Sequence, residues 1–456
     1  MPLCLLDWPQ LSWRGPSALR DGPRVLGINP WIYDFAAYNF WLRPAGLLAC
    51  LEMLRQSGCT VGLLDCLDQT WASSPWPRTT PWASGHFPKT PVPKPAALRH
   101  VPRGYSRYGL DYETVAAAMA RQDRPPDIVL LTCLMTYWLP GAAAAIELVR
   151  RHWPATPIVL GGTYASLCTA HAQSLSVDLL LSGPLEAPEN WAALWRLLGQ
   201  AATPPLPAQA GFDLGLELYP APGYGPILGS RGCPFACGYC ASKLLYGRFV
   251  QRKFPDIWEE TASQLRNGVR NFAFFDDALL VAPEVWLIPL LERLAAWPEP
   301  VFLHTPNALH VRYLTPALCR LLKAAGLTTI RLGLESTTFT DRHDAKLTAE
   351  EWEAGLAALL GAGFEPCQIG VYILFGLPDE SPDQVRASIA AIHRRGLKVY
   401  LTHYSPLPGT PLFDRALAVS GLPLADEPLL QNNSIWPCVP GGFTWQAHAE
   451  WKKVLG

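Results

Sequence analysis

The sequence predicts an α/β fold in two parts, an N-terminal Rossmann-like open parallel sheet followed by a (β/α)6 partial barrel of the TIM type. Short apolar strands alternate with amphipathic helices along most of the 456 residues, a pattern typical of parallel sheets covered on both faces. The alternation breaks at 201–224, where Pro, Ala and Gly dominate as in a linker. Beyond it the strand–helix unit recurs roughly every 30 to 40 residues, as a barrel requires.

These observations divide the chain into five expected segments. They are an N-terminal extension over 1–21, the Rossmann-like domain over 22–200 with a basic loop at 71–110, the linker over 201–224, the barrel over 225–415 and a C-terminal extension over 416–456.

The N-terminal domain is expected from apolar strands that bracket helices. Residues 24–29 (RVLGIN) and 60–65 (TVGLLD) are such strands, and with a helix at 44–55 they form one βαβ unit. Further strands are expected at 127–132, 157–160 and 177–181, with helices at 142–151 and 190–198.

One long loop interrupts this domain at 71–110. It holds three tryptophans, many prolines and six basic residues, with no acidic residue. Long connections without secondary structure are often lids or binding loops, and the positive charge would suit an anionic ligand. The alternative is an irregular strap packed over an apolar surface by its tryptophans. The sequence leaves both interpretations open.

In the barrel, the helices carry clear end signals. Capping boxes are expected at Thr348/Glu351 and Ser381/Gln384. The other signals are Pro316 and Pro382 at first helical positions, and Gly326, Gly363 and Gly396 just past helix ends. The expected strands are 226–231, 270–276, 301–305, 328–334, 367–375 and 398–403.

Composition limits the compartment and the partners. The net charge is -1, so no global field attracts nucleic acid or anionic membrane. Twelve cysteines, nine of them scattered, do not form a disulfide framework. The start has no basic signal-peptide region, and no run approaches the roughly 18 apolar residues of a membrane span. We therefore expect a cytoplasmic protein.

The strongest chemical signal is a loop with cysteines at 233, 237 and 240, spaced C-x3-C-x2-C. Thiolates are the ligands of iron–sulfur clusters, and three of them leave one iron of a 4Fe-4S cube open for another ligand. Arg231 and Lys243 flank the loop, and positive charge favours the thiolate. Structural zinc fits less well because it needs four ligands. Buried, unreactive cysteines are the other alternative.

This loop resembles the signature of the radical S-adenosylmethionine (SAM) superfamily, C-x3-C-x-aromatic-C, in which Cys233, Cys237, Tyr239 and Cys240 fill every position. The resemblance implies that the open iron chelates SAM. An electron from the cluster then splits SAM into methionine and a 5'-deoxyadenosyl radical. It also implies a reducing electron donor such as a ferredoxin or flavodoxin.

The resemblance also indicates SAM-contacting residues at the carboxyl ends of the barrel strands, where the chemistry of such barrels lies. They are Phe275, Asp276, Glu335, Ser336, Ile373, Gly376 and Tyr404. Glu335 follows an apolar strand, where an isolated carboxylate needs a partner; the amino group of SAM would supply one. A structural role stays open for Asp276, Asp277 and Ser336, which could cap helices. For His304, a structural role is slightly favoured over acid–base chemistry.

The N-terminal domain is similar to the cobalamin-binding domain that precedes many radical SAM barrels. Its family elements are Thr132-Cys133-Leu134 and the pair Gly161-Gly162, where a corrin or nucleotide tail can approach the backbone. The family's histidine loop is replaced by residues 29–34, and no histidine precedes His86. A bound cobalamin would therefore have water, Tyr33 or nothing as its lower ligand.

Three functions follow. The first is a radical SAM enzyme that transfers a methyl group to carbon with the help of cobalamin. The second is a radical SAM enzyme that abstracts hydrogen without cobalamin. The third is a non-catalytic iron–sulfur carrier or sensor, although carriers normally ligate all four irons. The sequence identifies neither a substrate nor a catalytic side chain.

Overall fold

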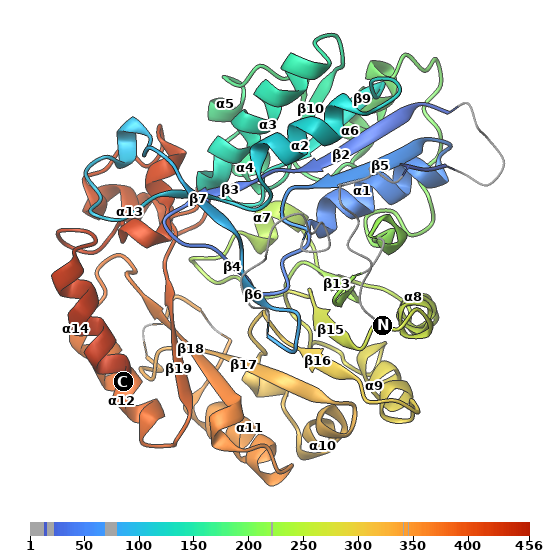
Figure 1. Cartoon of the computed structure of the whole chain (residues 1–456). Coiled ribbons are helices and arrows are strands. Elements are labelled where there is room, and N and C mark those ends of the chain that lie inside the picture. Colours follow the sequence, from blue (N-terminus) through green and yellow to red (C-terminus); the bar gives the residue numbers. More distant parts are fainter. Residues whose placement is uncertain (1–12, 16–21, 69–79, 220–221, 341, 345) are drawn as a thin grey trace. The chain divides into compact units, whose positions relative to one another are not determined.

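The chain forms two compact units (Figure 1), each described here by itself. The computed structural model describes residues 13–15, 22–68, 80–219, 222–340, 342–344 and 346–456. The first unit comprises Met1–Pro222 and Leu424–Gln431, and the second comprises Gly223–Pro423 and Asn432–Gly456. Residues 424–431 thus belong to the first unit although they lie within the stretch expected as a C-terminal extension.

The first unit is built on a six-stranded sheet in the order β1-β5-β2-β9-β10-β11. All neighbouring pairs are parallel except β1 with β5. Its strands are β1 (Trp13–Arg14), β2 (Arg24–Asn29), β5 (Thr60–Asp65), β9 (Ile128–Thr132), β10 (Ile158–Gly161) and β11 (Leu179–Leu180). From β2 the chain passes to β5 on one side of it and then crosses to β9 on the other side, so the direction of the strand order reverses at β2. In open α/β sheets, ligands bind at such a switch point, beyond the carboxyl ends of the strands.

Helices pack closely on this sheet because glycines allow it. Helix α1 packs against β2 and β5, and a Cβ on Gly27 would lie 2.6 Å from the Leu51 side chain. Helix α3 meets the loop after β2, where a Cβ on Gly141 would lie 1.9 Å from the Trp31 carbonyl oxygen. The helices are α1 (Ala45–Gln56), α2 (Tyr112–Ala120), α3 (Leu139–His152), α4 (Thr163–Leu167), α5 (Thr169–Ala172) and α6 (Pro188–Leu197).

The loop expected at 71–110 is not structureless where it is described. Strand β6 (Gly85–His86) pairs with β4 (Tyr38–Asn39). Strands β7 (Lys89–Pro91) and β8 (Ser106–Tyr108) form a three-stranded sheet with β3 (Ile32–Asp34). The Trp82 backbone carbonyl accepts a hydrogen bond from the Trp41 indole at 2.7 Å, which ties this part of the loop to the segment before α1. Trp71, Trp76 and Arg78 lie outside the described residues.

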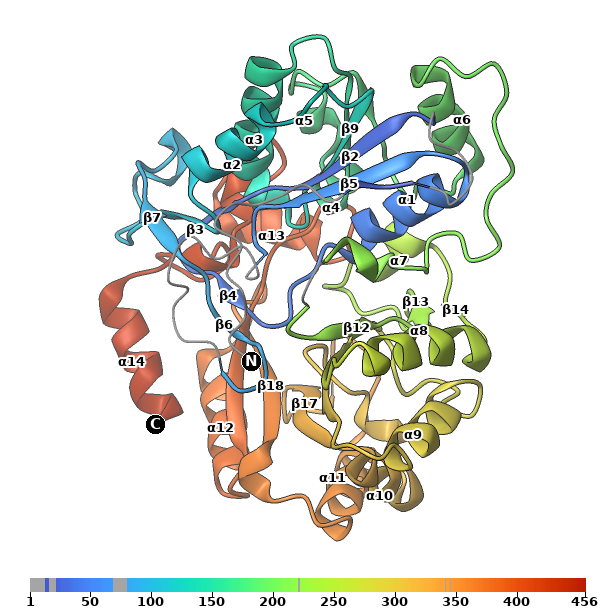
Figure 2. The same cartoon turned by 45° about the vertical axis from the view of Figure 1, so that its right-hand side comes forward.

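The second unit contains a six-stranded parallel sheet in the order β12-β15-β16-β17-β18-β19. The strands of this sheet therefore lie side by side in the same order as they occur in the chain. In both views β18 lies beside β17, and α12 packs on β18 and β19 (Figures 1 and 2). The strands are β12 (Gly225–Ile227), β15 (Asn271–Phe274), β16 (Phe302–His304), β17 (Leu327–Glu335), β18 (Ile369–Phe375) and β19 (Lys398–His403).

The helices of this unit largely begin and end where the sequence indicates. Thr348 forms its capping box with Glu351. The capping box expected at Ser381 is wrong, because the Ser381 side chain makes no cap hydrogen bond. Gly326, Gly363 and Gly396 all have positive φ. The helices are α7 (Ser242–Tyr246), α8 (Phe254–Arg266), α9 (Leu287–Ala295), α10 (Pro316–Ala324), α11 (Ala349–Gly361), α12 (Pro382–His393), α13 (Phe413–Ser420) and α14 (Trp445–Leu455).

The α/β class with parallel sheets is therefore confirmed. One expected strand, 226–231, is wrong: the sheet strand β12 stops at Ile227, and β13 (Ser230–Arg231) pairs antiparallel with β14 (Val250–Gln251). The chain leaves the sheet at Gly229, where a Cβ would lie 2.3 Å from the Trp286 ring. Among the described helices, none has the length and apolar character needed to cross a membrane.

Candidate functional site

The three cysteines lie on the loop between β13 and α7 in the second unit. All three are free thiols; Cys233 and Cys237 are partly buried and Cys240 is exposed. The loop starts with a tight turn at Gly232 (φ +77°), where a Cβ would lie 2.6 Å from the Arg248 carbonyl oxygen. Glycine is the residue that tolerates both this φ and this approach.

The thiols are held in a largely desolvated environment. Burial raises the pKa of Cys237 to about 11 and also raises the pKa of Cys233, while the Lys346 charge partly opposes both shifts. Arg231 and Lys243, which we expected to favour the thiolates, are not among the main causes of these shifts, whereas Lys346 is. A hydrogen bond from the Phe235 backbone N–H to Cys233 also lowers its pKa.

The donor set fits an iron–sulfur cluster better than a single metal ion. Across the described part of the chain, no three His, Cys, Asp or Glu side chains gather as ligands of one metal ion. Structural zinc needs four converging ligands. In a 4Fe-4S cube each thiolate binds a different iron, so the three sulfurs need not converge on one point.

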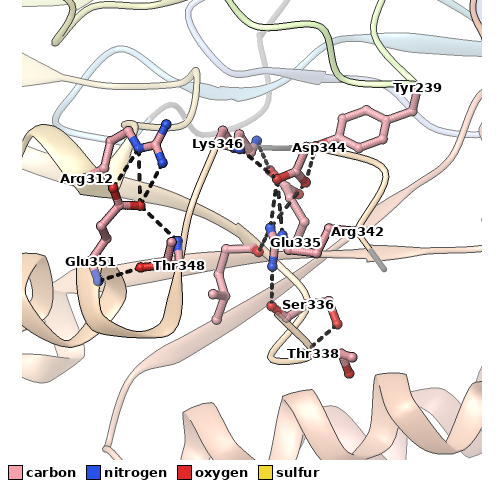
Figure 3. A network of polar contacts seen from close by, with 11 residues as sticks. Tyr239, Arg312, Glu335, Ser336, Thr338, Arg342, Asp344, Lys346, Thr348 and Glu351 are labelled. Atoms are coloured by element: carbon pink, nitrogen blue, oxygen red, sulfur yellow. Dashed lines mark hydrogen bonds and ion pairs between the residues drawn. The ribbon is translucent and has the colours of Figure 1, made fainter. Parts of the chain in front are cut away.

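A charged network lies at the end of β17 (Figure 3). Glu335 accepts a hydrogen bond from Lys346 Nζ at 2.6 Å, and each side chain is only 11% exposed. A register shift between β17 and β18 at Gly333/Glu335 and a φ of +65° at Glu335 orient this carboxylate. Glu335 is therefore not the isolated carboxylate expected from the sequence, because the chain itself provides the cation.

Asp344 joins this network to the cysteine loop. It accepts hydrogen bonds from Tyr239 Oη at 3.1 Å and from Arg342 Nε at 3.1 Å (Figure 3). Burial alone would lower the pKa of Lys346, but the negative charges of Glu335 and Asp344 and the hydrogen bond to Glu335 raise it. Lys346 therefore stays charged.

Backbone hydrogen bonds hold the cysteine loop on two sides. The Gly238 N–H donates to the His343 carbonyl at 2.7 Å, and the Gly238 carbonyl accepts from the Leu412 N–H at 3.0 Å. The loop is thus fixed between the segment after β17 and the start of α13.

Two aspartates after β15 hold the ends of the same loop. Asp276 is 2% exposed and accepts hydrogen bonds from Ser230 Oγ at 2.5 Å and from the Gly229 N–H at 3.3 Å. Asp277 accepts one from Ser242 Oγ at 2.6 Å. Burial raises the pKa of Asp276 to about 7, against these hydrogen bonds. The helix-capping alternative is wrong for both aspartates, since they bind the residues that flank the cysteines.

The other expected residues lie at the ends of the strands. The Phe275 N–H donates to the Ile227 carbonyl, and the Tyr404 N–H donates to the Phe375 carbonyl. Ser336 Oγ accepts from the Thr338 N–H at 3.0 Å in a local turn. Ile373 is 1% exposed. Gly376 (φ +82°) donates its N–H to Glu380 Oε2 at 2.6 Å.

His304 has a structural role, as favoured from the sequence. Its side chain is buried, with Nδ1 3.0 Å from Thr329 Oγ1 and Nε2 3.4 Å from Asn271 Oδ1. Burial lowers the pKa of His304 to about 3. The imidazole is therefore neutral at physiological pH.

In the first unit, the glycine pair lies at the end of β10, with Gly161 as its last residue and Gly162 directly after it. Gly162 has φ +94°, and a Cβ there would lie 2.8 Å from the Cys133 carbonyl oxygen and from Thr132 Oγ1. Around Gly161 the nearest atom to a Cβ is 3.9 Å away. Gly162 is therefore required by the fold itself, while the backbone at Gly161 is open to close approach.

Side chains at the end of β2 and in the loop after it are held by hydrogen bonds within the protein. Asn29 Nδ2 donates to Asp65 Oδ1 at 2.7 Å, and the Trp31 indole donates to the Leu110 carbonyl at 2.7 Å. Tyr33 lies in β3, where burial raises its pKa although Arg107 partly opposes the shift. Its phenol is therefore protonated.

Residues 227–392, which include the cysteine loop and the Glu335 network, match the protein family described as the Radical SAM superfamily. This chain carries a radical SAM domain. The resemblance inferred from the C-x3-C-x-aromatic-C motif is thereby confirmed.

Curated relatives of this chain are named methylases or methyltransferases. An uncharacterized methyltransferase of Pyrococcus horikoshii is 27% identical over 222 residues, covering 45% of this chain and 45% of the relative. Bacteriochlorophyllide d C-12(1)-methyltransferase of Chlorobaculum tepidum is 25% identical, covering 41% and 42%. Hopanoid C-2 methylase of Rhodopseudomonas palustris is 25% identical, covering 58% and 53%. The chain thus spans about half the length of these relatives.

Among solved structures, this chain is similar to the radical S-adenosylmethionine methyltransferase TsrM of Kitasatospora setae. The TM-score is 0.63 at 18% identity, covering 88% of this chain and 77% of TsrM with tryptophan and a SAM analogue bound. A second TsrM structure, with cobalamin and a 4Fe-4S cluster, matches equally well, covering 76% of that chain. At this identity the likeness shows a shared fold.

Sequence reasoning missed Arg342, Asp344 and Lys346. They lie in a short stretch between a strand and a capping box, where charged residues usually face solvent. The signal in the sequence was that these charged residues occupy every second position shortly after Glu335 and alternate in sign.

Proposed function

We propose that this chain is a radical SAM enzyme in which Cys233, Cys237 and Cys240 hold a 4Fe-4S cluster that cleaves SAM reductively to methionine and a 5'-deoxyadenosyl radical. The observation that carries the proposal is the loop that begins with a turn at Gly232 and holds three free thiols, within the residues that match the radical SAM family. When bound, the cluster supplies the electron for this cleavage. We further propose that the enzyme methylates carbon with the help of cobalamin.

The residues around the loop position it and tune its charge. Asp276 and Asp277 hold the serines at its two ends, and Asp344 holds Tyr239. Asp276 and Asp344 are buried, so their hydrogen bonds to the loop are shielded from water. Lys346 offsets part of the negative charge that three thiolates would bring into a desolvated site.

SAM would contact the strand ends beside this loop. We assign that role to Tyr239, Phe275, Asp276, Glu335, Ser336, Ile373, Gly376 and Tyr404. Glu335 is the residue with a specific chemical reason, since its carboxylate can accept a hydrogen bond from an amino group. It is already paired with Lys346, so the amino group of SAM would share Glu335 with that lysine.

The strand orders support the finer fold assignment. We interpret the second sheet as a (β/α)6 partial barrel of the TIM type, because its members are parallel and neighbouring strands follow in order. We interpret the first unit as a Rossmann-like domain, because its five parallel strands have the order 2-1-3-4-5 with a switch point between β2 and β9.

Cobalamin would bind to the first unit. The support is the shared fold with TsrM, which has been seen with cobalamin, and the open backbone at Gly161, the last residue of β10. The loop after β2 has no histidine, so the lower face of the cobalt would meet water, the protonated Tyr33 phenol or no ligand.

The experiment is anaerobic reconstitution of the full chain with iron and sulfide, then incubation with SAM and a reduced flavodoxin. We expect 5'-deoxyadenosine and methionine in equal amounts by mass spectrometry. The absence of both products from a protein that holds its cluster would contradict radical cleavage. Purification with excess hydroxocobalamin tests the methyltransferase assignment: a protein that retains no corrin spectrum but still forms 5'-deoxyadenosine is a hydrogen-abstracting enzyme instead.

A further inference from the structure

We infer that helix α7 and the turn after it form the docking surface for an acidic one-electron carrier protein. This surface, called the α7 patch, consists of Lys243, Leu244, Tyr246 and Arg248. The inference rests on the proposed function, because cleavage of SAM consumes one electron that must come from outside the chain.

The α7 patch combines exposed apolar and basic side chains. Leu244 is 50% exposed and Tyr246 is 43% exposed, while Lys243 and Arg248 are both exposed. Apolar side chains with a charged rim are typical of protein interfaces. The Arg231 guanidinium lies 5.6 Å from the centre of the Tyr246 ring, and Leu244 lies beside Gly409, yet about half of each apolar side chain stays exposed on this helix of five residues.

The chain segment that carries the patch has basic residues but no acidic ones. Residues 229–253 contain five basic residues and no acidic residue, whereas the whole chain has a net charge of -1. Arg252 is directed to Glu260 by an ion pair, and Arg231 lies over the Tyr246 ring. Lys243 and Arg248 are exposed within the patch, and Lys253 is exposed just beyond it. Such a local field attracts an acidic partner and speeds its encounter.

The patch is physically connected to the cysteine loop. Strands β13 and β14 pair across the segment that holds both the loop and α7. At the start of the loop, Gly232 lies against the Arg248 carbonyl and the Tyr246 side chain. Cys240 is itself exposed, and only Ala241 separates it from the first residue of α7. A carrier on this patch would therefore lie next to the thiolate of Cys240, which shortens the path of the electron.

The chemical step is simple. The reduced flavin of the carrier loses one electron, the cluster gains it, and no atom is transferred. The partner is therefore a small acidic protein whose redox centre lies near its surface, with flavodoxin as the probe.

The test is stopped-flow reduction of the reconstituted full chain by reduced flavodoxin, followed by bleaching of the cluster absorbance. In Lys243→Glu/Arg248→Glu we expect about a tenfold slower reduction at low ionic strength, and the two proteins should converge at high salt. Reduction by the methyl viologen radical, a small cation, should be at least as fast as in the wild type. The control Lys452→Glu/Lys453→Glu makes the same charge change on exposed residues of α14 and should match the wild type.

Three results would overturn the inference. The first is an unchanged rate of reduction by flavodoxin in Lys243→Glu/Arg248→Glu. The second is an equally slow reduction of the α14 control. The third is an equally slow reduction of Lys243→Glu/Arg248→Glu by methyl viologen, which would indicate a damaged cluster. Binding of a short RNA that depends on Lys243 and Arg248, with flavodoxin reduction unaffected, would assign the patch to nucleic acid. A chain that assembles no cluster contradicts the proposed function instead, and iron analysis before mixing separates that case.

Discussion

The ion pair between Glu335 and Lys346 allows a quantitative test of the site. Both side chains are 11% exposed and their charged atoms are 2.6 Å apart. Removal of one partner leaves the other charge buried, which destabilises a protein by about 3 kcal/mol or more. Loss of both charges removes that penalty. We therefore expect Glu335→Gln and Lys346→Met each to lower the free energy of unfolding by about 3 kcal/mol. The loss in the double variant should be about 2 kcal/mol smaller than the sum of the two single losses.

The assay is urea unfolding of the cluster-free protein under anaerobic conditions. The pair Glu353–Arg395 is the control, because it has the same 2.6 Å separation but side chains that are 55% and 40% exposed. Glu353→Gln should cost less than about 1 kcal/mol. If Glu335→Gln costs no more than Glu353→Gln, Lys346 is solvated and the reasoning about the network is wrong.

Two further predictions concern stability. Burial raises the pKa of Glu380 to about 7 from its ordinary value near 4.5. The folded state thus binds this proton more tightly, and the free energy of unfolding falls as pH rises from about 4.5 to 7. Glu380→Gln should reduce that fall by up to about 3 kcal/mol in urea titrations between these pH values; an unchanged pH profile would place Glu380 in solvent. Gly162→Ala should destabilise the first unit by about 2 kcal/mol in thermal unfolding, because of its positive φ and the crowding at Cys133. Gly46→Ala, where a Cβ meets nothing within 4 Å, is the control and should not destabilise it.

Local patterns made the main strands predictable. Residues 24–29 and 60–65 coincide with β2 and β5, because apolar runs between turn residues indicate buried parallel strands. The strands inside 85–108 were missed, because β6 and β8 pair with β4 and β3 about 50 to 70 residues earlier in the chain, and β7 pairs only with β8. Such short strands are stabilised by distant partners and leave no periodic pattern of their own.

The site was predictable only where spacing carries the chemistry. The cysteine motif identified the superfamily, because three ligands at fixed spacing form one loop. The partner of Glu335 was not predictable, since its geometry depends on the register shift at the end of β17. Likewise, nothing in the sequence shows that Asp276 binds Ser230 across two strands.

The most direct test of the central claim is electron paramagnetic resonance of the anaerobically reconstituted chain, reduced with and without SAM. We predict close to four irons per chain and a 4Fe-4S signal that changes on addition of SAM, since three cysteine ligands leave one iron open. Cys240→Ala should lose both the signal and the iron. A full iron content in Cys240→Ala, or a wild-type signal that stays the same when SAM is added, would contradict the account.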